Sequence, residues 1–310
     1  MSRRIVPIFA GQGAQAVGMG RDLAEAFPEA RARFEAADDL LGFSLTGAMF
    51  DGPQAELTRT SRCQPALYAH GLACFDLLRE RVPDLEIAGT AGLSLGEFTA
   101  HAAAGTFDFE TGMRLVAKRG QFMEEATDAI EGAMAAMIGG DEEAVQKLAA
   151  ECDIDVANFN APGQIVVSGT KPGVARAVAE AKARGIKIAK ELDVAGAYHS
   201  RLMRPAREKL AAELATVAIR EPAVPVVCNV EARAVSGVED IRRTLEAQVT
   251  GSVRWAESMR VFLDRGETTF VEFGPGGVLA GLMKRIERAA TVLSVADVPS
   301  LEAAAAALRG

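Results

Sequence analysis

Short apolar runs alternate along the chain with longer stretches in which apolar residues recur every three or four positions. The short runs predict strands and the periodic stretches predict helices. The predicted strands are Ile5–Phe9, Ile87–Leu93, Gln164–Ser168, Val224–Val230, Thr269–Phe273 and Thr291–Val295. The predicted helices are Gly20–Leu41, Pro65–Arg81, Leu95–Ala103, Glu110–Ala126, Val174–Arg184, Arg201–Ala215, Val253–Arg265, Val278–Arg288 and Leu301–Leu308. This alternation predicts an α/β fold with a central, mostly parallel sheet.

The middle of the chain has a different order of predicted strands and helices. A strand at Ala133–Gly139 precedes a helix from Glu142, two strands, a helix and a last strand at Lys187–Val194. This order is typical of a small ferredoxin-like sheet. We therefore predict that residues 131–198 form an inserted subdomain, and that residues 1–130 and 199–310 together form one discontinuous catalytic domain.

Composition and charge exclude several classes of function. The chain has 310 residues, of which 49% are hydrophobic, and its net charge is −8. An acidic protein does not bind nucleic acid through a broad basic surface, and no run of about 18 apolar residues predicts a membrane-spanning helix. The four cysteines lack CxxC spacing, which favours reduced thiols in the cytoplasm. His70 and Cys74 stand four residues apart without a second such pair, so we expect no metal site and no cofactor.

The strongest candidate for chemistry is Ser94, which lies in the GxSxG pattern of Gly92–Gly96. This pattern is typical of a sharp strand-to-helix turn that exposes a nucleophilic serine, with the following helix N-terminus directed at the site. A glycine-rich turn buried in the core is the alternative.

Three histidines could serve as the base. His70 lies in an apolar helix, and His101 follows Ser94 by two helical turns, too far along to reach its hydroxyl. His199 stands in a glycine-containing loop, which is where a base at the mouth of a cleft belongs. We therefore predict His199 as the base.

The loop from Gly11 to Ala16 also fits the G-x-G-x-x-A pattern of dinucleotide-binding proteins. Two further glycines extend this loop, however, and no second strand ending in an acidic residue follows. The loop is better explained as the source of a backbone N–H beside the serine.

Taken together, these segments resemble the malonyl-CoA:acyl carrier protein transacylase family over nearly the whole chain. The motifs that carry the resemblance are Gly11–Gln15, Gly92–Glu97, Arg119–Met123, Asn158–Gln164, Tyr198–Met203, Gln248 with Val253–Trp255, and Glu272–Gly276. Leu93 departs from the histidine of many members, and Ala10 from a frequent proline.

The resemblance implies an α/β-hydrolase-like large domain that carries the ferredoxin-like insertion. It implies that Ser94 is the nucleophile and His199 the general base, oriented by the main-chain carbonyl of Gln248. It also implies an oxyanion hole made by the backbone N–H groups of Gln12 and Leu95.

The resemblance further assigns the substrate contacts. Arg119 would hold the malonyl carboxylate, for which its planar fork is suited, in the same helical motif as Met123. Asn158, Asn160 and Gln164 would lie on the CoA side, and the bulky Tyr198 favours malonyl over methylmalonyl.

We therefore expect a monomeric enzyme that transfers malonyl from malonyl-CoA to acyl carrier protein in fatty-acid synthesis. One alternative is an acyltransferase acting in trans on a polyketide synthase. A second is a thioesterase, whose histidine would need a carboxylate such as Asp193. Two clusters of basic residues could contact the acidic carrier, or could simply be solvated helix faces. The first cluster consists of Lys182, Arg184, Lys187 and Lys190, and the second of Arg201, Arg204 and Arg207.

Overall fold

In the computed structural model, which describes residues 3–310, strand β1 (Arg4–Phe9) lies inside a five-stranded parallel sheet. The sheet order is β2 (Glu86–Ile87), β1, β8 (Thr269–Phe273) and β9 (Thr291–Val295), and β3 (Ala91–Gly92) also pairs with β1. All of β8 is buried, as expected for a parallel sheet covered on both faces.

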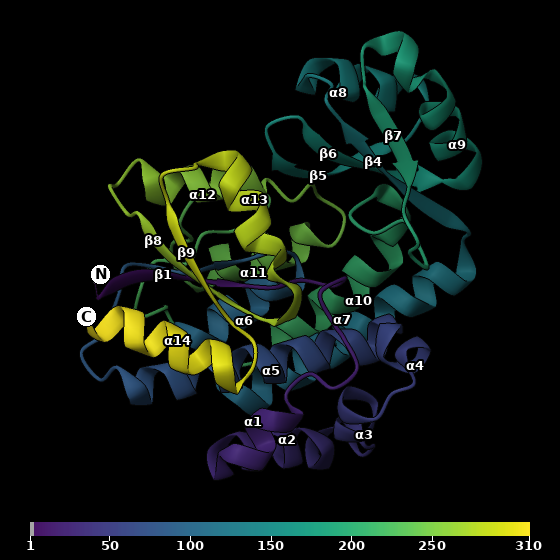
Figure 1. Ribbon diagram of the computed structural model, residues 1–310. Helices are drawn as coiled ribbons and strands as arrows, with labels where there is room; N and C mark the ends of the chain where they lie inside the picture. The colour runs from purple at the N-terminus through teal and green to yellow at the C-terminus, as the bar shows by residue number, and fades with distance from the viewer. Residues whose placement is uncertain (1–2) are drawn as a thin grey trace.

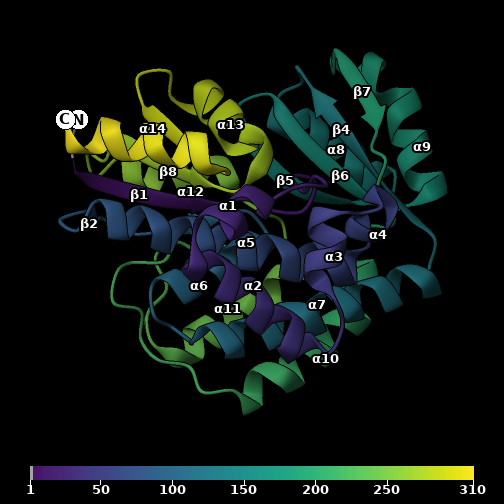
Figure 2. The ribbon, with the colours of Figure 1, turned by 60° about the horizontal axis from the view of Figure 1, so that its bottom comes forward.

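Helices cover both faces of this sheet (Figures 1 and 2). The helices of this part of the molecule, some of which pack on other helices, are α1 (Arg21–Ala26), α2 (Pro28–Leu41), α3 (Leu45–Phe50), α4 (Gln54–Thr58), α5 (Thr60–Arg81), α6 (Leu95–Ala103), α7 (Phe109–Ala129), α10 (Arg204–Thr216), α11 (Val238–Gln248), α12 (Trp255–Leu263), α13 (Val278–Ile286) and α14 (Val298–Arg309). Ile5 and Phe9 point into a core shared with α5, α6, α7 and α14. Val6 and Ile8 point to the other face, where α12 and α13 pack.

The second sheet is antiparallel and has its own small core. Its strands are β4 (Gly132–Ile138), β5 (Asp155–Ala161), β6 (Gln164–Thr170) and β7 (Ile188–Glu191), in the spatial order β5-β6-β4-β7. Helices α8 (Glu142–Glu151) and α9 (Lys171–Glu180) pack on it. The elements follow one another in the order that the sequence predicts.

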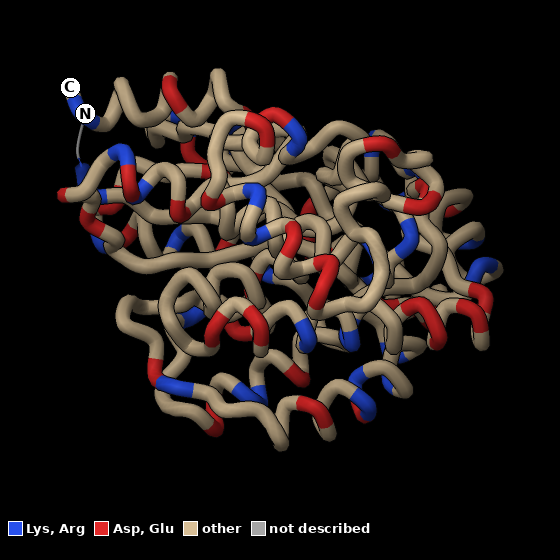
Figure 3. The backbone as a smooth tube through the Cα atoms, turned by 90° about the horizontal axis from the view of Figure 1, so that it is seen from below, with Lys and Arg blue, Asp and Glu red and all other residues tan. Residues whose placement is uncertain are grey.

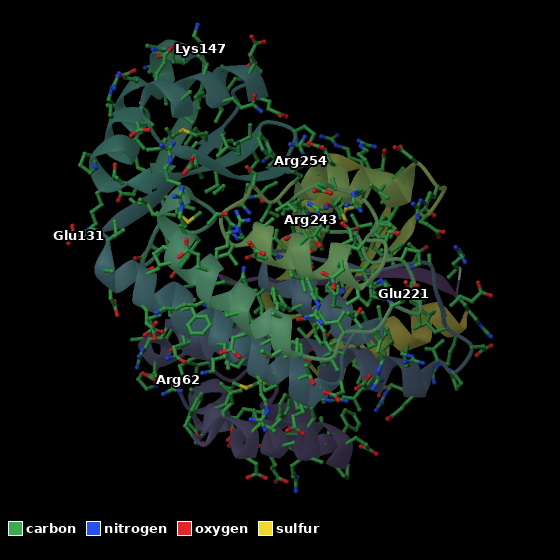
Figure 4. All side chains as sticks on the ribbon, turned by 180° about the vertical axis from the view of Figure 1, so that it is seen from behind. Arg62, Glu131, Lys147, Glu221, Arg243 and Arg254 are labelled. Atoms are coloured by element: carbon green, nitrogen blue, oxygen red, sulfur yellow. The ribbon has the colours of Figure 1, made fainter. Side chains whose placement is uncertain are left out.

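Strand β5 joins the antiparallel sheet to the rest of the molecule. The N–H of Phe159 donates to the carbonyl of Val253, and the N–H of Val253 donates to the carbonyl of Ala157, both at 2.8 Å. The guanidinium of Arg254 lies 5.6 Å from the ring centroid of Phe159. Figure 4 shows Arg254 where the two parts of the molecule meet and Lys147, on α8, at the outer end of the part that holds the antiparallel sheet.

Several predicted elements are wrong in detail. Val224–Val230 forms no strand and makes only single bridges, at Val226 and Val227. The strand expected over Ile87–Leu93 is split into β2 and β3, and the helix over Gly20–Leu41 is broken before Pro28. Pro65 lies inside α5 rather than at its start.

Charged residues of both signs are interspersed along the chain (Figure 3). Within residues 3–310, no helix is long and apolar enough to cross a membrane.

Candidate active site

Ser94 occupies a sharp turn between β3 and α6. Its φ of 55° and ψ of −107° lie outside the regions that non-glycine residues prefer. Its backbone N–H donates to Oδ1 of Asn229 at 2.7 Å, which holds the strained peptide in place. Because Ser94 is the N-cap of α6, the positive end of that helix faces the serine.

Glycine is required on both sides of the serine. A Cβ on Gly92 would lie 1.9 Å from the carbonyl oxygen of Gly96, and a Cβ on Gly96 would lie 2.2 Å from that of Phe9. Both obstacles are backbone atoms, which cannot move aside cheaply. The predicted nucleophile turn is therefore present, with α6 packed directly on β1, but the prediction that it exposes the serine is wrong, because Ser94 is buried.

His199 lies within hydrogen-bond reach of the serine. Its Nε2 is 2.7 Å from Oγ of Ser94, and its Nδ1 is 2.9 Å from the main-chain carbonyl of Gln248. A carbonyl only accepts, so Nδ1 carries the proton and Nε2 is free to accept the serine proton. Burial, assisted by the charge of Arg119, lowers the pKa of His199 to about 4, so the imidazole is neutral near pH 7.

Arg119, on α7, brings a buried cation to the same place. Its Nη2 donates to Oγ of Ser94 at 3.0 Å and to Oε1 of Gln248 at 2.8 Å, and its Nη1 donates to Oε1 of Gln64 at 2.7 Å. Its side chain is 1% exposed, and its Nε has no hydrogen-bond partner within residues 3–310. Burial lowers the pKa of Arg119 to about 10, which leaves it charged at neutral pH.

The guanidinium of Arg119 makes no direct ion pair with a carboxylate in the described part of the chain. It is hydrogen-bonded to neutral amide oxygens and the serine hydroxyl and lies near the ring of Phe98, whose centroid is 5.5 Å away, while the Glu97 carboxyl acts on it only through space and raises its pKa. A buried cation without a counter-ion is unfavourable unless a ligand supplies one. The arrangement therefore suits an anionic group beside Ser94.

Two backbone N–H groups are available near the serine. Neither Gln12 nor Leu95 donates its backbone N–H to any acceptor within residues 3–310. Leu95 is the first residue of α6, and Gln12 lies in the loop after β1, which pairs with β3. Free donors from these two segments suit an oxyanion.

Tyr198 is linked to the loop after β1. Its hydroxyl lies 2.6 Å from Oγ1 of Thr60, which also accepts from Nε2 of Gln12 at 3.3 Å. Met123, one turn along α7 from Arg119, is buried, and its sulfur accepts from Nε2 of Gln64.

The three residues predicted for the CoA side lie on the antiparallel sheet. Asn158 and Asn160 are in β5, and Gln164 begins β6. None of them makes a hydrogen bond to Ser94 or His199 within the described chain. Oδ1 of Asn160 is buried without a partner there.

The other histidines are kept away from the chemistry. Nε2 of His70 lies 2.9 Å from the carbonyl of Ala296, and Nδ1 of His101 lies 3.0 Å from Oγ1 of Thr106. Burial lowers the pKa of both histidines. No group of three or more His, Cys, Asp and Glu side chains suited to a metal ion occurs over residues 3–310.

Sequence reasoning missed Gln64, Glu97 and Asn229 as members of the site. Glu97 directly follows the GxSxG pattern, and an acidic residue in the first turn of an apolar helix is a usable signal. Asn229 was assigned to a strand that does not form. Gln64 lay just before the helix predicted from Pro65 and gave no signal, whereas in the structure it is a buried residue of α5.

Comparison with known proteins agrees with this geometry. The model of a family described as the acyl transferase domain matches residues 6–306. A malonyl CoA-acyl carrier protein transacylase from Bacillus subtilis is 41% identical, over 99% of this chain and 98% of that protein, and one from Escherichia coli K12 is 40% identical over 96% and 97%.

Solved structures agree as well. A malonyl CoA-acyl carrier protein transacylase from Coxiella burnetii has a TM-score of 0.95 and 35% identity, over 99% of this chain and 98% of that one. A malonyl-transacylase in complex with a type II polyketide acyl-carrier protein has a TM-score of 0.93 and 38% identity, over 98% and 99%.

Proposed function

Because the chain belongs to the acyl transferase domain family, we propose that it transfers a malonyl group from malonyl-CoA to the phosphopantetheine thiol of acyl carrier protein, supplying fatty-acid synthesis. The observation that carries this proposal is the buried Arg119, which has no carboxylate partner and donates to Oγ of the serine that His199 contacts. An acid-bearing acyl group completes that arrangement.

In the first half-reaction, Oγ of Ser94 attacks the thioester carbonyl while Nε2 of His199 takes the hydroxyl proton. The negative charge that develops on the carbonyl oxygen is stabilised by the backbone N–H groups of Gln12 and Leu95. The intermediate collapses, the carbon–sulfur bond breaks, and the CoA sulfur leaves with the proton held by His199. The product is malonyl-Ser94.

The second half-reaction reverses these steps with a new thiol. His199 takes the proton of the phosphopantetheine thiol, the sulfur attacks the ester carbonyl, and Ser94 regains its proton from His199. A thioester is exchanged for an ester and back again, so no separate energy source is needed, and the kinetics are ping-pong.

Arg119 gives the reaction its selectivity. Its guanidinium forms charge-assisted hydrogen bonds with the malonyl carboxylate, for which its Nε, unpartnered in the described chain, is available while the Gln248 amide oxygen holds Nη2. An acetyl group would leave the buried cation unpaired. Gln248 contributes twice, because its side chain contacts Arg119 and its main-chain carbonyl orients His199.

The remaining substrate contacts belong to the same proposal. Met123 supports the acyl pocket beside Gln64, and Tyr198 limits its size to malonyl. Asn158, Asn160 and Gln164 face the CoA chain from β5 and the start of β6.

The proposal extends to the architecture and the compartment. We assign residues 1–130 and 199–310 to an α/β-hydrolase-like domain, of which residues 1 and 2 lie outside the described part, and residues 131–198 to a ferredoxin-like subdomain. The strand order β5-β6-β4-β7 supports the second assignment. Four free cysteines support a reducing compartment, the cytoplasm.

A thioesterase is the less supported alternative. Asp193, the carboxylate nearest in sequence to His199, is exposed and makes no hydrogen bond to it. The imidazole is held by a carbonyl instead. A role in polyketide synthesis would use the same residues and differ only in the carrier.

Transfer is tested with malonyl-CoA, holo-acyl carrier protein and catalytic amounts of the enzyme, with the mass of the carrier as the readout. We expect the carrier to gain one malonyl group with wild type and not with Ser94→Ala. Free malonate without a malonylated carrier would support the hydrolase. Malonylation of a polyketide carrier but not of a fatty-acid carrier would move the enzyme to the other pathway.

A further inference from the structure

Glu97 is a buried acid that the reaction itself does not use. It lies on the first turn of α6, is 0% exposed and makes no direct ion pair within residues 3–310, although the charge of Arg119 acts on it through space. A buried carboxyl group is unfavourable unless other groups compensate it, so its contacts indicate its purpose.

One carboxyl oxygen of Glu97 accepts two hydrogen bonds. Its Oε2 accepts from Nε2 of Gln248 at 2.6 Å and from the backbone N–H of Asn229 at 3.0 Å. These two residues are also the ones that hold the peptide units of Ser94. Nε2 of Gln248 donates to the Ser94 carbonyl at 2.9 Å, and Oδ1 of Asn229 accepts the Ser94 N–H at 2.7 Å.

Together with the Ser94 carbonyl, which accepts from the same nitrogen at 2.9 Å, this contact with Glu97 fixes which way the Gln248 amide faces. Its nitrogen is directed at Glu97, so its oxygen is directed at Arg119 and accepts from Nη2 at 2.8 Å. With the amide reversed, two donors would meet at Arg119 and two acceptors at Glu97. Glu97 thereby holds the acceptor that keeps Nη2 beside Oγ of Ser94.

From this geometry we propose that Glu97 is a positioning residue for acyl selectivity: it fixes the Gln248 amide, which aims Arg119 at the acyl carboxylate. The inference rests on the proposed malonyl transfer. It follows that changes at Glu97 should lower kcat/KM more for malonyl-CoA than for acetyl-CoA. The malonyl carboxylate binds the guanidinium of Arg119, and acetyl has no carboxylate.

For this positioning role, the length of the side chain at position 97 should be more important than its negative charge. Burial raises the pKa of Glu97 to about 7, so the carboxyl group is partly protonated near neutral pH. Its Oε1 has no hydrogen-bond partner in the described chain and is free to carry that proton while Oε2 keeps both bonds. A glutamine has the same length and an acceptor oxygen, whereas an aspartate is one methylene shorter.

The test compares Glu97→Gln and Glu97→Asp by kcat/KM for malonyl-CoA and for acetyl-CoA with the same carrier. We expect Glu97→Asp to lower the malonyl-to-acetyl ratio by at least about tenfold, since small misplacements near the chemistry cost up to about 10²-fold. Glu97→Gln should keep the ratio within about threefold of wild type, the conservative rescue that a positioning role predicts.

Glu272 is the matched control. It is a buried glutamate whose carboxylate accepts from the backbone N–H groups of Leu279 and Ala280, away from the site. Glu272→Gln and Glu272→Asp should leave the ratio unchanged.

An unchanged ratio in Glu97→Asp, or a loss in Glu97→Gln equal to that in Glu97→Asp, would overturn the inference. The first result would leave Glu97 a purely structural role, and the second would make its charge decisive. Failure of the wild type to form malonyl-Ser94 would instead count against the proposed function.

Discussion

The hydroxyl of Ser94 lies between a neutral base and a cation. Oγ is 2.7 Å from Nε2 of His199 and accepts from Nη2 of Arg119 at 3.0 Å. The cation next to the oxygen favours the alkoxide that forms as the proton leaves. Burial, assisted by the same cation, lowers the pKa of His199 and so keeps the imidazole unprotonated and able to accept a proton.

The pH dependence of acylation should reflect the pKa of His199. Because the protonated imidazole cannot act as a base, we expect the rate of Ser94 malonylation to fall only as pH approaches about 4. Rapid-quench mass spectrometry across the pH range measures this rate. A fall centred at 6.5, the ordinary value for histidine, would contradict the assigned environment. Glu97→Gln, which removes the ionisation near pH 7, should show the same inflection.

Replacing Arg119 by lysine keeps a charge but removes the planar fork. We expect Arg119→Lys to lower kcat/KM for malonyl-CoA by roughly 10- to 100-fold, because the paired hydrogen bonds to the carboxylate are lost. Turnover of acetyl-CoA, which has no carboxylate, should change much less. Steady-state kinetics with both thioesters provide the check, and equal losses for the two would argue against the clamp.

Glu97 should lower stability at high pH. Its folded pKa of about 7 lies above the ordinary 4.5, so the folded state holds its proton more tightly and loses stability as pH rises through that window. Relative to wild type, Glu97→Gln should therefore gain up to about 3 kcal/mol between pH 4.5 and pH 7, with no further gain above it. Urea unfolding at several pH values measures this difference, and a difference that does not vary with pH would contradict it.

At the scale of elements, the active serine depends on how closely α6 packs on β1. A methyl group on Gly96 would meet the Phe9 carbonyl oxygen at 2.2 Å, so Gly96→Ala must push the helix away from the strand. We expect a loss of at least about 3 kcal/mol and of malonylation. Gly281→Ala is the control: Gly281 lies in α13 with open space around its Cβ, and the change should gain up to about 1 kcal/mol. Urea unfolding of both variants measures these changes, and a neutral Gly96→Ala would show that the turn is not tightly constrained.

Periodicity predicted most of the long elements, and its failures have physical causes. Helix α11 was missed because its buried stripe is narrow: Ile241 and Leu245 are its only fully buried large apolar residues, and most of the remainder is polar. Val224–Val230 has a strand-like composition but makes single bridges only. Pro65 reads as a helix start, yet α5 begins five residues earlier at Thr60, because its helical contacts outweigh one missing N–H.

The candidate site was predictable where a motif fixes the residue. Ser94, His199 and Arg119 belong to separate motifs, and the structure brings them together. The contacts of Glu97, Gln64 and Asn229 could not be predicted from the sequence. They join residues that are far apart in the chain and come together only in the folded structure.

At the scale of the whole molecule, an acidic enzyme must still receive an acidic carrier. Of the basic residues that follow His199, Arg201 pairs with Asp153 and Asp155, and Arg207 pairs with Glu246. Arg204 is exposed and has no ion-pair partner within residues 3–310. It is therefore the member of that cluster that is available to a partner.

Reversing that charge should affect the carrier and not malonyl-CoA. We expect Arg204→Glu to raise the KM for acyl carrier protein by roughly three- to tenfold, since rim charges act mainly on association. The rate of Ser94 malonylation should not change. Lys147→Glu is the control, because Lys147 lies on α8 at the outer end of the part that holds the antiparallel sheet (Figure 4). An effect of Lys147→Glu equal to that of Arg204→Glu would mean that only net charge matters.

The central claim is that Ser94 carries the malonyl group while Arg119 holds its carboxylate. The most direct measurement is the intact mass of the protein after brief mixing with malonyl-CoA, for wild type, Ser94→Ala and Arg119→Ala. We predict one malonyl adduct on wild type, none on Ser94→Ala and a weakened adduct on Arg119→Ala. An adduct that persists on Ser94→Ala, or free malonate accumulating without any adduct on wild type, would contradict the account.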